Sequence, residues 1–226
     1  MKIADRHEFR IPYMVGVYLA ANAIPDLYLL TDGPDCLFFK AEYVQGSHDL
    51  HSDLLDACGH HRVAHTLADT VNVVTDREPD VRERIRRVAA SPGAGVVLLT
   101  ALPMASITGS QYDRIGREVA AAVGKPVVEV AARSLDGDWL DGYAEVLVSL
   151  ARGLPLEGEP EPTAVAIVGL LVDRTESDQL ANVREVRRMV EQATGAEVCS
   201  IWPSNRPVAH LSAAGRAGTI LSLPYG

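Results

Sequence analysis

The chain has 226 residues and a formal net charge of −9, and 47% of its residues are hydrophobic while 23% are charged. This composition is typical of a globular protein that buries its own core, and it argues against a mainly disordered chain. The acidic balance also argues against a general nucleic-acid surface, which needs clustered lysine and arginine. No apolar stretch reaches the roughly 18 residues of a membrane span. We therefore expect neither nucleic acid nor a membrane as a partner.

The cysteines indicate the redox environment of the protein. There are three of them, at Cys36, Cys58 and Cys199, which is an odd number, and the polar N-terminus does not look like a secretion signal. We interpret them as reduced thiols or metal ligands and expect a cytoplasmic protein.

Short aliphatic runs alternate with longer amphipathic segments along the first two thirds of the chain, and this alternation predicts an α/β fold. The expected buried strands are Leu27–Leu30, Val71–Val74, Val96–Leu99 and Pro126–Val130. The expected helices are Asp80–Ala90, Ser110–Val123 and Asp138–Arg152, with Gly124 and Gly153 as C-terminal stops. This order predicts right-handed crossovers and Rossmann-like, doubly wound parallel sheets.

The acidic, proline-rich stretch 154–162 has no apolar period and is a candidate linker. It would separate an N-terminal Rossmann-like α/β domain, 1–153, from a second, incomplete unit of the same kind, 163–226. In that unit we expect strands at Thr163–Gly169, Ala196–Ile201 and Thr219–Leu223 and helices at Glu176–Thr194 and Val208–Ala214. About sixty residues is close to the lower limit for independent folding. We therefore expect a truncated unit, or one completed by the first domain or by a second subunit.

The turn after the first expected strand is the leading candidate site. Ligands of an open parallel sheet collect beyond the carboxyl ends of its strands, where Asp32, Gly33, Pro34, Asp35 and Cys36 are expected to lie. Glycine and proline predict a sharp turn that presents Cys36 near a helix N-terminus, and the helix dipole there favours a thiolate. Such a thiolate suits a nucleophile or a soft-metal ligand. The alternative is a buried structural cysteine.

A second candidate is a group of histidines near Cys58. Five of the seven histidines fall between positions 48 and 65. His61 and His65 have the spacing that places two imidazoles on one face of a helix, so a zinc site using Cys58 is conceivable. No carboxylate lies between them as in the hydrolytic His-Glu-x-x-His pattern, and polar loops often carry histidines without a function.

Several segments match one known pattern in order. Ala23–Cys36 has the layout of a strand that ends in a His-Gly-Pro-x-Gly-Cys turn, with Asp32 in place of the histidine and one residue fewer before the cysteine. Leu99–Gly109 looks like a Cys-Pro segment leading into a helix start, and Pro126–Val130 and Asp136–Tyr143 look like the strand and glycine-rich turn that follow. Together, over roughly residues 10 to 225, they resemble the nitrogenase component 1 type oxidoreductase family, which includes the dark-operative protochlorophyllide and chlorophyllide reductases.

The resemblance implies nitrogenase component 1-like lobes and an iron–sulfur cluster, 4Fe-4S, held by cysteines of two related subunits. Only Cys36 matches a ligand position; the family's earlier cysteine has no counterpart at 10–12, and its later one falls at Leu102. One thiolate per chain cannot hold such a cluster, but a symmetric dimer supplies two. Asp32, Asp35 or Cys58 could complete the set, because iron also accepts carboxylate.

Three hypotheses follow. The first is an electron-transfer oxidoreductase subunit, in a homodimer or a heterodimer with a similar subunit, that receives electrons from an ATP-dependent iron–sulfur reductase and acts on a small-molecule substrate. The second is a non-catalytic scaffold or binding relative that has lost the cluster. The third is a zinc enzyme that uses Cys58 and the neighbouring histidines.

Overall fold

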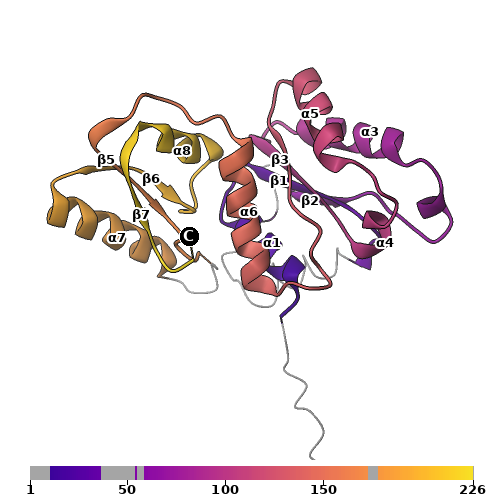
Figure 1. Ribbon diagram of the computed structural model, residues 1–226, viewed down its shortest axis with the longest axis horizontal. Coiled ribbons are helices and arrows are strands. Elements are labelled where there is room, and N and C mark those ends of the chain that lie inside the picture. Colours follow the sequence, from indigo (N-terminus) through magenta and orange to yellow (C-terminus); the bar gives the residue numbers. More distant parts are fainter. Residues whose placement is uncertain (1–10, 37–53, 55–58, 173–177, 226) are drawn as a thin grey trace, which may run out of the picture.

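A computed structural model describes residues 11–36, 54, 59–172 and 178–225 of the protein. It contains two parallel β-sheets that lie side by side, with helix α6 (Trp139–Gly153) between them (Figure 1). Within the described residues, no helix is both long and apolar enough to cross a membrane.

The first sheet has four parallel strands in the order β2-β1-β3-β4. All six residues of each central strand are buried, as is typical of aliphatic strands in a sheet covered on both faces. The strands are β1 (Leu27–Asp32), β2 (Val63–His65), β3 (Val96–Ala101) and β4 (Val127–Glu129). The strands predicted at Leu27–Leu30, Val96–Leu99 and Pro126–Val130 are thus confirmed.

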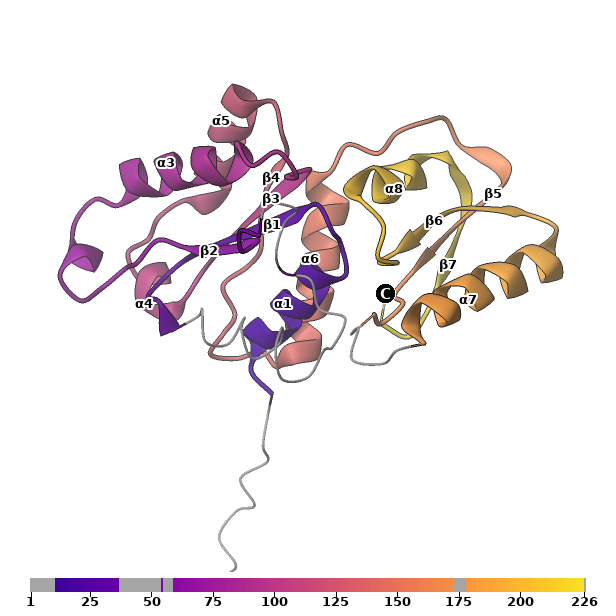
Figure 2. The ribbon, with the colours of Figure 1, turned by 180° about the vertical axis from the view of Figure 1, so that it is seen from behind.

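Helices cover both faces of this sheet, so the doubly wound α/β architecture is as predicted. α3 (Glu78–Ala89) and α5 (Tyr112–Val123) pack on one face, while α1 (Tyr13–Asn22) and α6 pack on the other (Figure 2). The short helix α4 (Pro103–Ser106) follows β3. α5 ends at Gly124, whose φ of 69° is left-handed, a conformation that glycine adopts without a Cβ clash.

Helices α1 and α6 are in backbone contact through two glycines. A Cβ on Gly16 would lie 1.7 Å from the carbonyl oxygen of Trp139, and one on Gly142 would lie 2.1 Å from the carbonyl oxygen of Tyr13. Neither position accepts a larger residue without a shift of the backbone. This close packing fixes the helix pair beneath the sheet.

The second sheet has three parallel strands in the order β6-β5-β7. These are β5 (Glu161–Val168), β6 (Glu197–Trp202) and β7 (Ala217–Ser222). α7 (Gln179–Thr194) packs on one face, and α8 (Val208–Ser212) with the 3₁₀ turn η2 (Ala213–Arg216) covers the other (Figure 2). β5 begins inside the stretch predicted as a linker, because Glu161 already pairs with Ala217.

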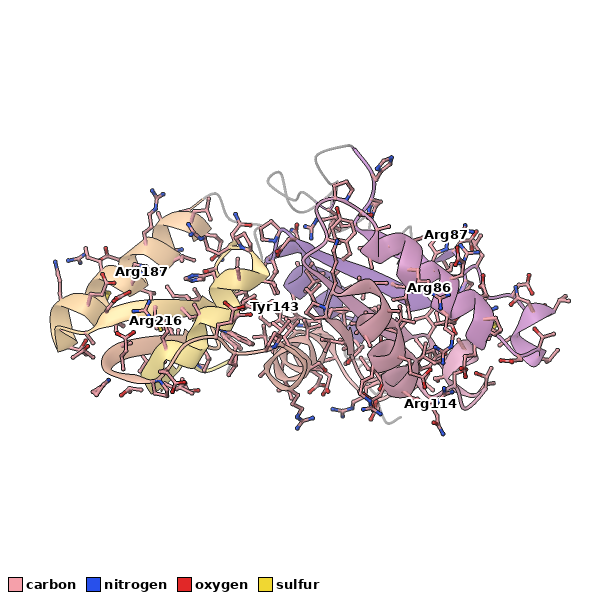
Figure 3. All side chains as sticks on the ribbon, turned by 90° about the horizontal axis from the view of Figure 1, so that it is seen from above. Arg86, Arg87, Arg114, Tyr143, Arg187 and Arg216 are labelled. Carbon is pink, nitrogen blue, oxygen red and sulfur yellow. The ribbon has the colours of Figure 1, made fainter. Side chains whose placement is uncertain are left out.

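We call the four-stranded sheet with its helices the first lobe and the three-stranded sheet with its helices the second lobe. Two side chains of the first lobe form hydrogen bonds with the backbone of the second. The hydroxyl of Tyr143 on α6 accepts a hydrogen bond from the Val172 amide at 2.8 Å and donates to the Leu170 carbonyl at 3.2 Å. The Val208 amide donates to the Asp26 carboxylate at 2.8 Å. Tyr143 accordingly lies between the two lobes in the view from above (Figure 3). The division into domains at 153 and 163 stays a prediction.

The strand predicted at Val71–Val74 is wrong. The segment contains the 3₁₀ turn η1 (Asn72–Val74), and the side chains of Val71 and Val74 are 77% and 83% exposed. The Asp69 carboxylate accepts hydrogen bonds from the amides of Val71 and Asn72, at 2.8 and 2.7 Å, and so caps a tight turn. Local side-chain bonding of this kind competes with strand formation.

Candidate functional site

The carboxyl ends of β1, β2 and β3 meet at one edge of the first sheet, as they must in a parallel sheet. A pocket of 430 Å³ opens there, formed by the loops that follow these three strands. It is lined by Pro34, Asp35, Leu67, Ala68, Asp69, Thr70 and Met104. The predicted turn therefore lies at a real concave edge, with Asp35 in its wall.

Asp32, the last residue of β1, is fully buried beneath this edge. Its Oδ1 accepts hydrogen bonds from the Arg77 guanidinium at 2.7 Å and from the Thr66 hydroxyl at 2.5 Å. Its Oδ2 accepts one from the Tyr112 hydroxyl at 2.7 Å. Both carboxylate oxygens are thus occupied inside the protein.

The partners of Asp32 form a network that joins four elements. Burial first, and then the negative charge of Asp32, raise the pKa of Tyr112 well above its ordinary value, so this hydroxyl stays protonated and donates. Arg77 also donates to Asn72 Oδ1 at 2.5 Å and to the Thr66 hydroxyl at 2.7 Å. The network connects β1, the loop after β2, the start of α3 and the start of α5.

Sequence reasoning missed this network. Thr66, Arg77 and Tyr112 lie on three separate segments that share no spacing. The available signal was Asp32 itself, because a carboxylate at the end of a fully apolar strand needs a buried cation or several donors. Burial of Asp32 therefore predicts that donors surround its carboxylate, but it does not identify the residues that supply them.

The turn after Asp32 is tightly packed. The Gly33 amide donates to the Thr66 hydroxyl at 3.2 Å, and a Cβ on Gly33 would lie 2.9 Å from Cγ of Leu102. The Leu102 amide in turn donates to the Asp32 carbonyl at 2.8 Å. The family resemblance places a second cysteine at position 102, but Leu102 is apolar and packs directly against the turn.

Cys36 is an exposed free thiol at the end of the turn. The hydroxyl of Tyr18 on α1 is buried and has no hydrogen-bond partner among the described residues. Burial, and then the nearby Cys36 sulfur when it is a thiolate, raise the pKa of Tyr18 well above its ordinary value. The Tyr18 hydroxyl is therefore a protonated donor within electrostatic reach of Cys36.

Cys199 does not join Cys36 in the described structure. Cys199 lies buried in β6 of the second sheet, where burial raises the pKa of its thiol and Sγ donates to the Val165 carbonyl at 3.4 Å. Cys58 lies outside the described residues. The role predicted for Cys58 as a metal ligand stays a prediction.

The expected helical pairing of His61 and His65 is wrong, because this segment leads into strand β2. His65 is the last residue of β2 and pairs with Thr31, while Nδ1 of His61 accepts a hydrogen bond from the Val63 amide at 3.1 Å. Burial lowers the pKa of His65. In the described part of the chain, no three His, Cys, Asp or Glu side chains are grouped as a metal site.

The described residues of one chain do not fit a self-contained iron–sulfur cluster. Such a cluster is usually held by four protein thiolates. At this edge the described residues offer the thiolate of Cys36, whereas the Asp32 oxygens are occupied and Leu102 is apolar. Asp35 and Cys36 are both exposed, so they remain accessible to a second subunit.

The fold and this edge define a Rossmann-like α/β protein with a pocket at the carboxyl edge of its first sheet. The family model for nitrogenase component 1 type oxidoreductases matches residues 12–224. The chain therefore belongs to the nitrogenase component 1 type oxidoreductase family, as the ordered motifs predict.

Solved structures show the same fold. The chain is similar to nitrogenase Cp1 at pH 6.5, with a TM-score of 0.68 and 13% identity over 94% of this chain and 41% of that one. It is equally similar to nitrogenase Cp1 at pH 5, with a TM-score of 0.68 and 13% identity over 96% of this chain and 43% of that one. The chain thus spans about two fifths of their length. No curated protein sequence matches it.

Proposed function

We propose that the chain is an oxidoreductase subunit in which Cys36 supplies one ligand to a 4Fe-4S cluster shared with a second subunit. The observation that carries this proposal is the position of an exposed thiol directly beyond the carboxyl end of β1. The buried Asp32–Arg77 pair and the packing of Gly33 on Leu102 hold the turn that carries it. A ligand on a rigidly supported turn meets the geometric demand of a cluster site.

The second subunit would be another copy of the chain or a similar chain, so that two symmetry-related turns face each other. Each turn brings one thiolate and the carboxylate of Asp35, and iron accepts carboxylate as well as thiolate. A separate ATP-dependent iron–sulfur reductase would supply electrons to such a cluster, and the acceptor would be a small-molecule substrate. The protonated hydroxyl of Tyr18 would lie within electrostatic reach of the Cys36 sulfur.

A second candidate function is a non-catalytic scaffold or binding protein that retains the family fold without the cluster. Two observations favour it: both oxygens of Asp32 are bound internally, and Leu102 stands where the family resemblance places a cysteine. This candidate predicts a stable protein that takes up no iron.

Metal analysis separates the two candidates. The protein is purified without oxygen, and iron, acid-labile sulfide and zinc are measured per chain together with the mass of the oligomer. A shared cluster predicts about two iron and two sulfide per chain in a dimer, because four of each are divided between two chains. A colourless protein with neither iron nor sulfide after reconstitution contradicts the cluster proposal and supports the scaffold.

A further inference from the structure

A second pocket lies in the other lobe, where β6 ends and α7 begins. Its volume is 570 Å³, within the range of pockets that bind small molecules. It is lined by Leu180, Val183, Arg184, Arg187, Ser204, Asn205 and Arg206. It shares no residue with the Cys36 edge, so neither site depends on the other.

The pocket concentrates positive charge in an acidic protein. Three of its seven lining residues are arginines and none is a carboxylate. Most other surface arginines of the described residues form ion pairs, although Arg152 does not; Arg216, labelled in Figure 3, lies 2.9 Å from the Glu161 carboxylate. Arg184 and Arg206 form no ion pair with any described residue. Their charges are available to a ligand.

The third arginine, Arg187, is held in place by a backbone carbonyl and forms a long ion pair. Arg187 Nη1 donates to the Val198 carbonyl at 2.6 Å and lies 3.6 Å from the Glu191 carboxylate, too far for a strong hydrogen bond. Burial, and then the charges of Arg187 and Arg206, lower the pKa of His210 to about 4. His210 therefore lies within electrostatic reach of these two guanidinium groups.

Ser204 supplies an independent indication of a ligand. Its side chain is 6% exposed, and its hydroxyl has no hydrogen-bond partner among the described residues. A buried hydroxyl without a partner costs about 1–3 kcal/mol, so such groups are usually satisfied by water or a ligand. The turn is fixed by the Asn205 amide, which donates to the Ala23 carbonyl at 3.0 Å.

Helix α7 adds a favourable dipole. It has 16 residues, and Leu180 lies in its first turn, where the positive end of the helix dipole favours an anion. Leu180 and Val183 add apolar wall beside the arginines. The pocket thus offers cations at one side and a nonpolar surface at the other.

We propose that this pocket binds the phosphoryl group of a small-molecule ligand, with Arg184, Arg187 and Arg206 as the cationic contacts and the Ser204 hydroxyl as a further donor. A phosphoryl group carries more charge and more acceptor oxygens than a carboxylate, and guanidinium groups bind it through paired N–H donors. Leu180 and Val183 would contact the nonpolar part of the ligand.

The test is calorimetric titration of the full chain with inorganic phosphate, pyrophosphate and acetate at low ionic strength. The test variant is R184Q/R206Q. The matched control is R86Q/R87Q, which removes the same charge from α3 at the opposite end of the molecule (Figure 3). A third variant, Ser204→Ala, removes only the hydroxyl. Circular dichroism and unfolding midpoints check that each variant is folded.

We expect pyrophosphate to bind at least about tenfold more tightly than acetate, a difference of about 1.4 kcal/mol. R184Q/R206Q should weaken pyrophosphate binding by about tenfold or more, and Ser204→Ala by about threefold, as the loss of charged and neutral hydrogen bonds predicts. R86Q/R87Q should change the affinity for pyrophosphate by less than about twofold, because distant exposed charges are screened. Equal loss in the two double variants, equal affinity for acetate and pyrophosphate, or no binding at millimolar pyrophosphate would each overturn the proposal.

Discussion

The Arg77 guanidinium lies 2.7 Å from the Asp32 carboxylate, and the two side chains are only 4% and 0% exposed. Asp32 occupies the position of the family's turn histidine in the sequence pattern, yet its carboxylate points into the protein. Its contacts support the turn from beneath. The exposed side chains of the turn are those of Asp35 and Cys36.

Removing Asp32 should destabilise the protein strongly. Asp32→Ala leaves the buried Arg77 guanidinium with only the half-exposed Asp80 carboxylate, 3.9 Å away, as a counter-charge, and we expect the free energy of unfolding to fall by about 3–5 kcal/mol. Urea unfolding measures this change. Glu83→Ala is the control, because it breaks the exposed pair with Arg87, which is worth about 0–1 kcal/mol. An equal loss of unfolding free energy in the two variants would contradict a larger contribution of the buried ion pair to stability.

The hydroxyl of Tyr112 should act as part of the same network. Tyr112→Phe removes one donor to the Asp32 carboxylate, and we expect a loss of about 1.5–3 kcal/mol, the range for hydrogen bonds to charged groups. In a double-mutant cycle with Asp32→Ala, the two losses should not add. Tyr225→Phe, at an exposed position, serves as the control and should be neutral. Strict additivity would contradict the network.

The contact between α1 and α6 should not tolerate a methyl group. Gly16→Ala and Gly142→Ala each place a Cβ against the backbone of the facing helix, so both should lower the thermal midpoint or prevent folding. Gly116→Ala in α5 meets nothing closer than 3.4 Å and should be neutral, or stabilising by roughly 0.5–1 kcal/mol. Equal thermal midpoints for all three variants would refute this packing.

The stability of the second lobe should depend on His210 in acid. Its pKa is lowered from 6.5 to about 4, and Nε2 accepts a hydrogen bond from the Ile201 amide at 3.1 Å, so the folded state holds the neutral ring. The unfolded chain takes up the proton first as the pH falls, so this stabilisation is complete above pH 6.5 and is lost towards pH 4. The advantage of the wild type over His210→Gln should shrink across that range in urea unfolding. An advantage that grows on acidification would contradict it.

Much of the fold could be predicted because its central elements carry simple periodic signals. β1 and β3 are mainly aliphatic runs, and α3 and α5 show helical spacing of apolar residues, which in α5 ends at Gly124. Helix α1 carries no such signal, because it is buried on nearly every side between the sheet and α6. An apolar pattern without a polar face does not indicate its secondary structure.

The site could be predicted only in part, for a related reason. The carboxyl edge follows from strand order, but the partners of Asp32 come from distant loops. Strand β2 was missed because it is short and follows Arg62, whose buried guanidinium bonds the carbonyls of Ala21, Ile24 and Leu27 at 3.1, 3.0 and 2.7 Å. Tertiary contacts of this kind leave no pattern in the local sequence.

The proposal that Cys36 ligates a shared cluster is tested most directly by comparing Cys36→Ala with Cys199→Ala after anaerobic reconstitution with iron and sulfide. Cys199 is the matched control because it is buried in the other sheet. The measurement is the amount of iron and acid-labile sulfide per chain, with the thiolate-to-iron absorbance of the same samples. Cys36→Ala should lose both while Cys199→Ala keeps wild-type amounts. Equal iron and sulfide in the two variants, or none in the wild type, would contradict the account.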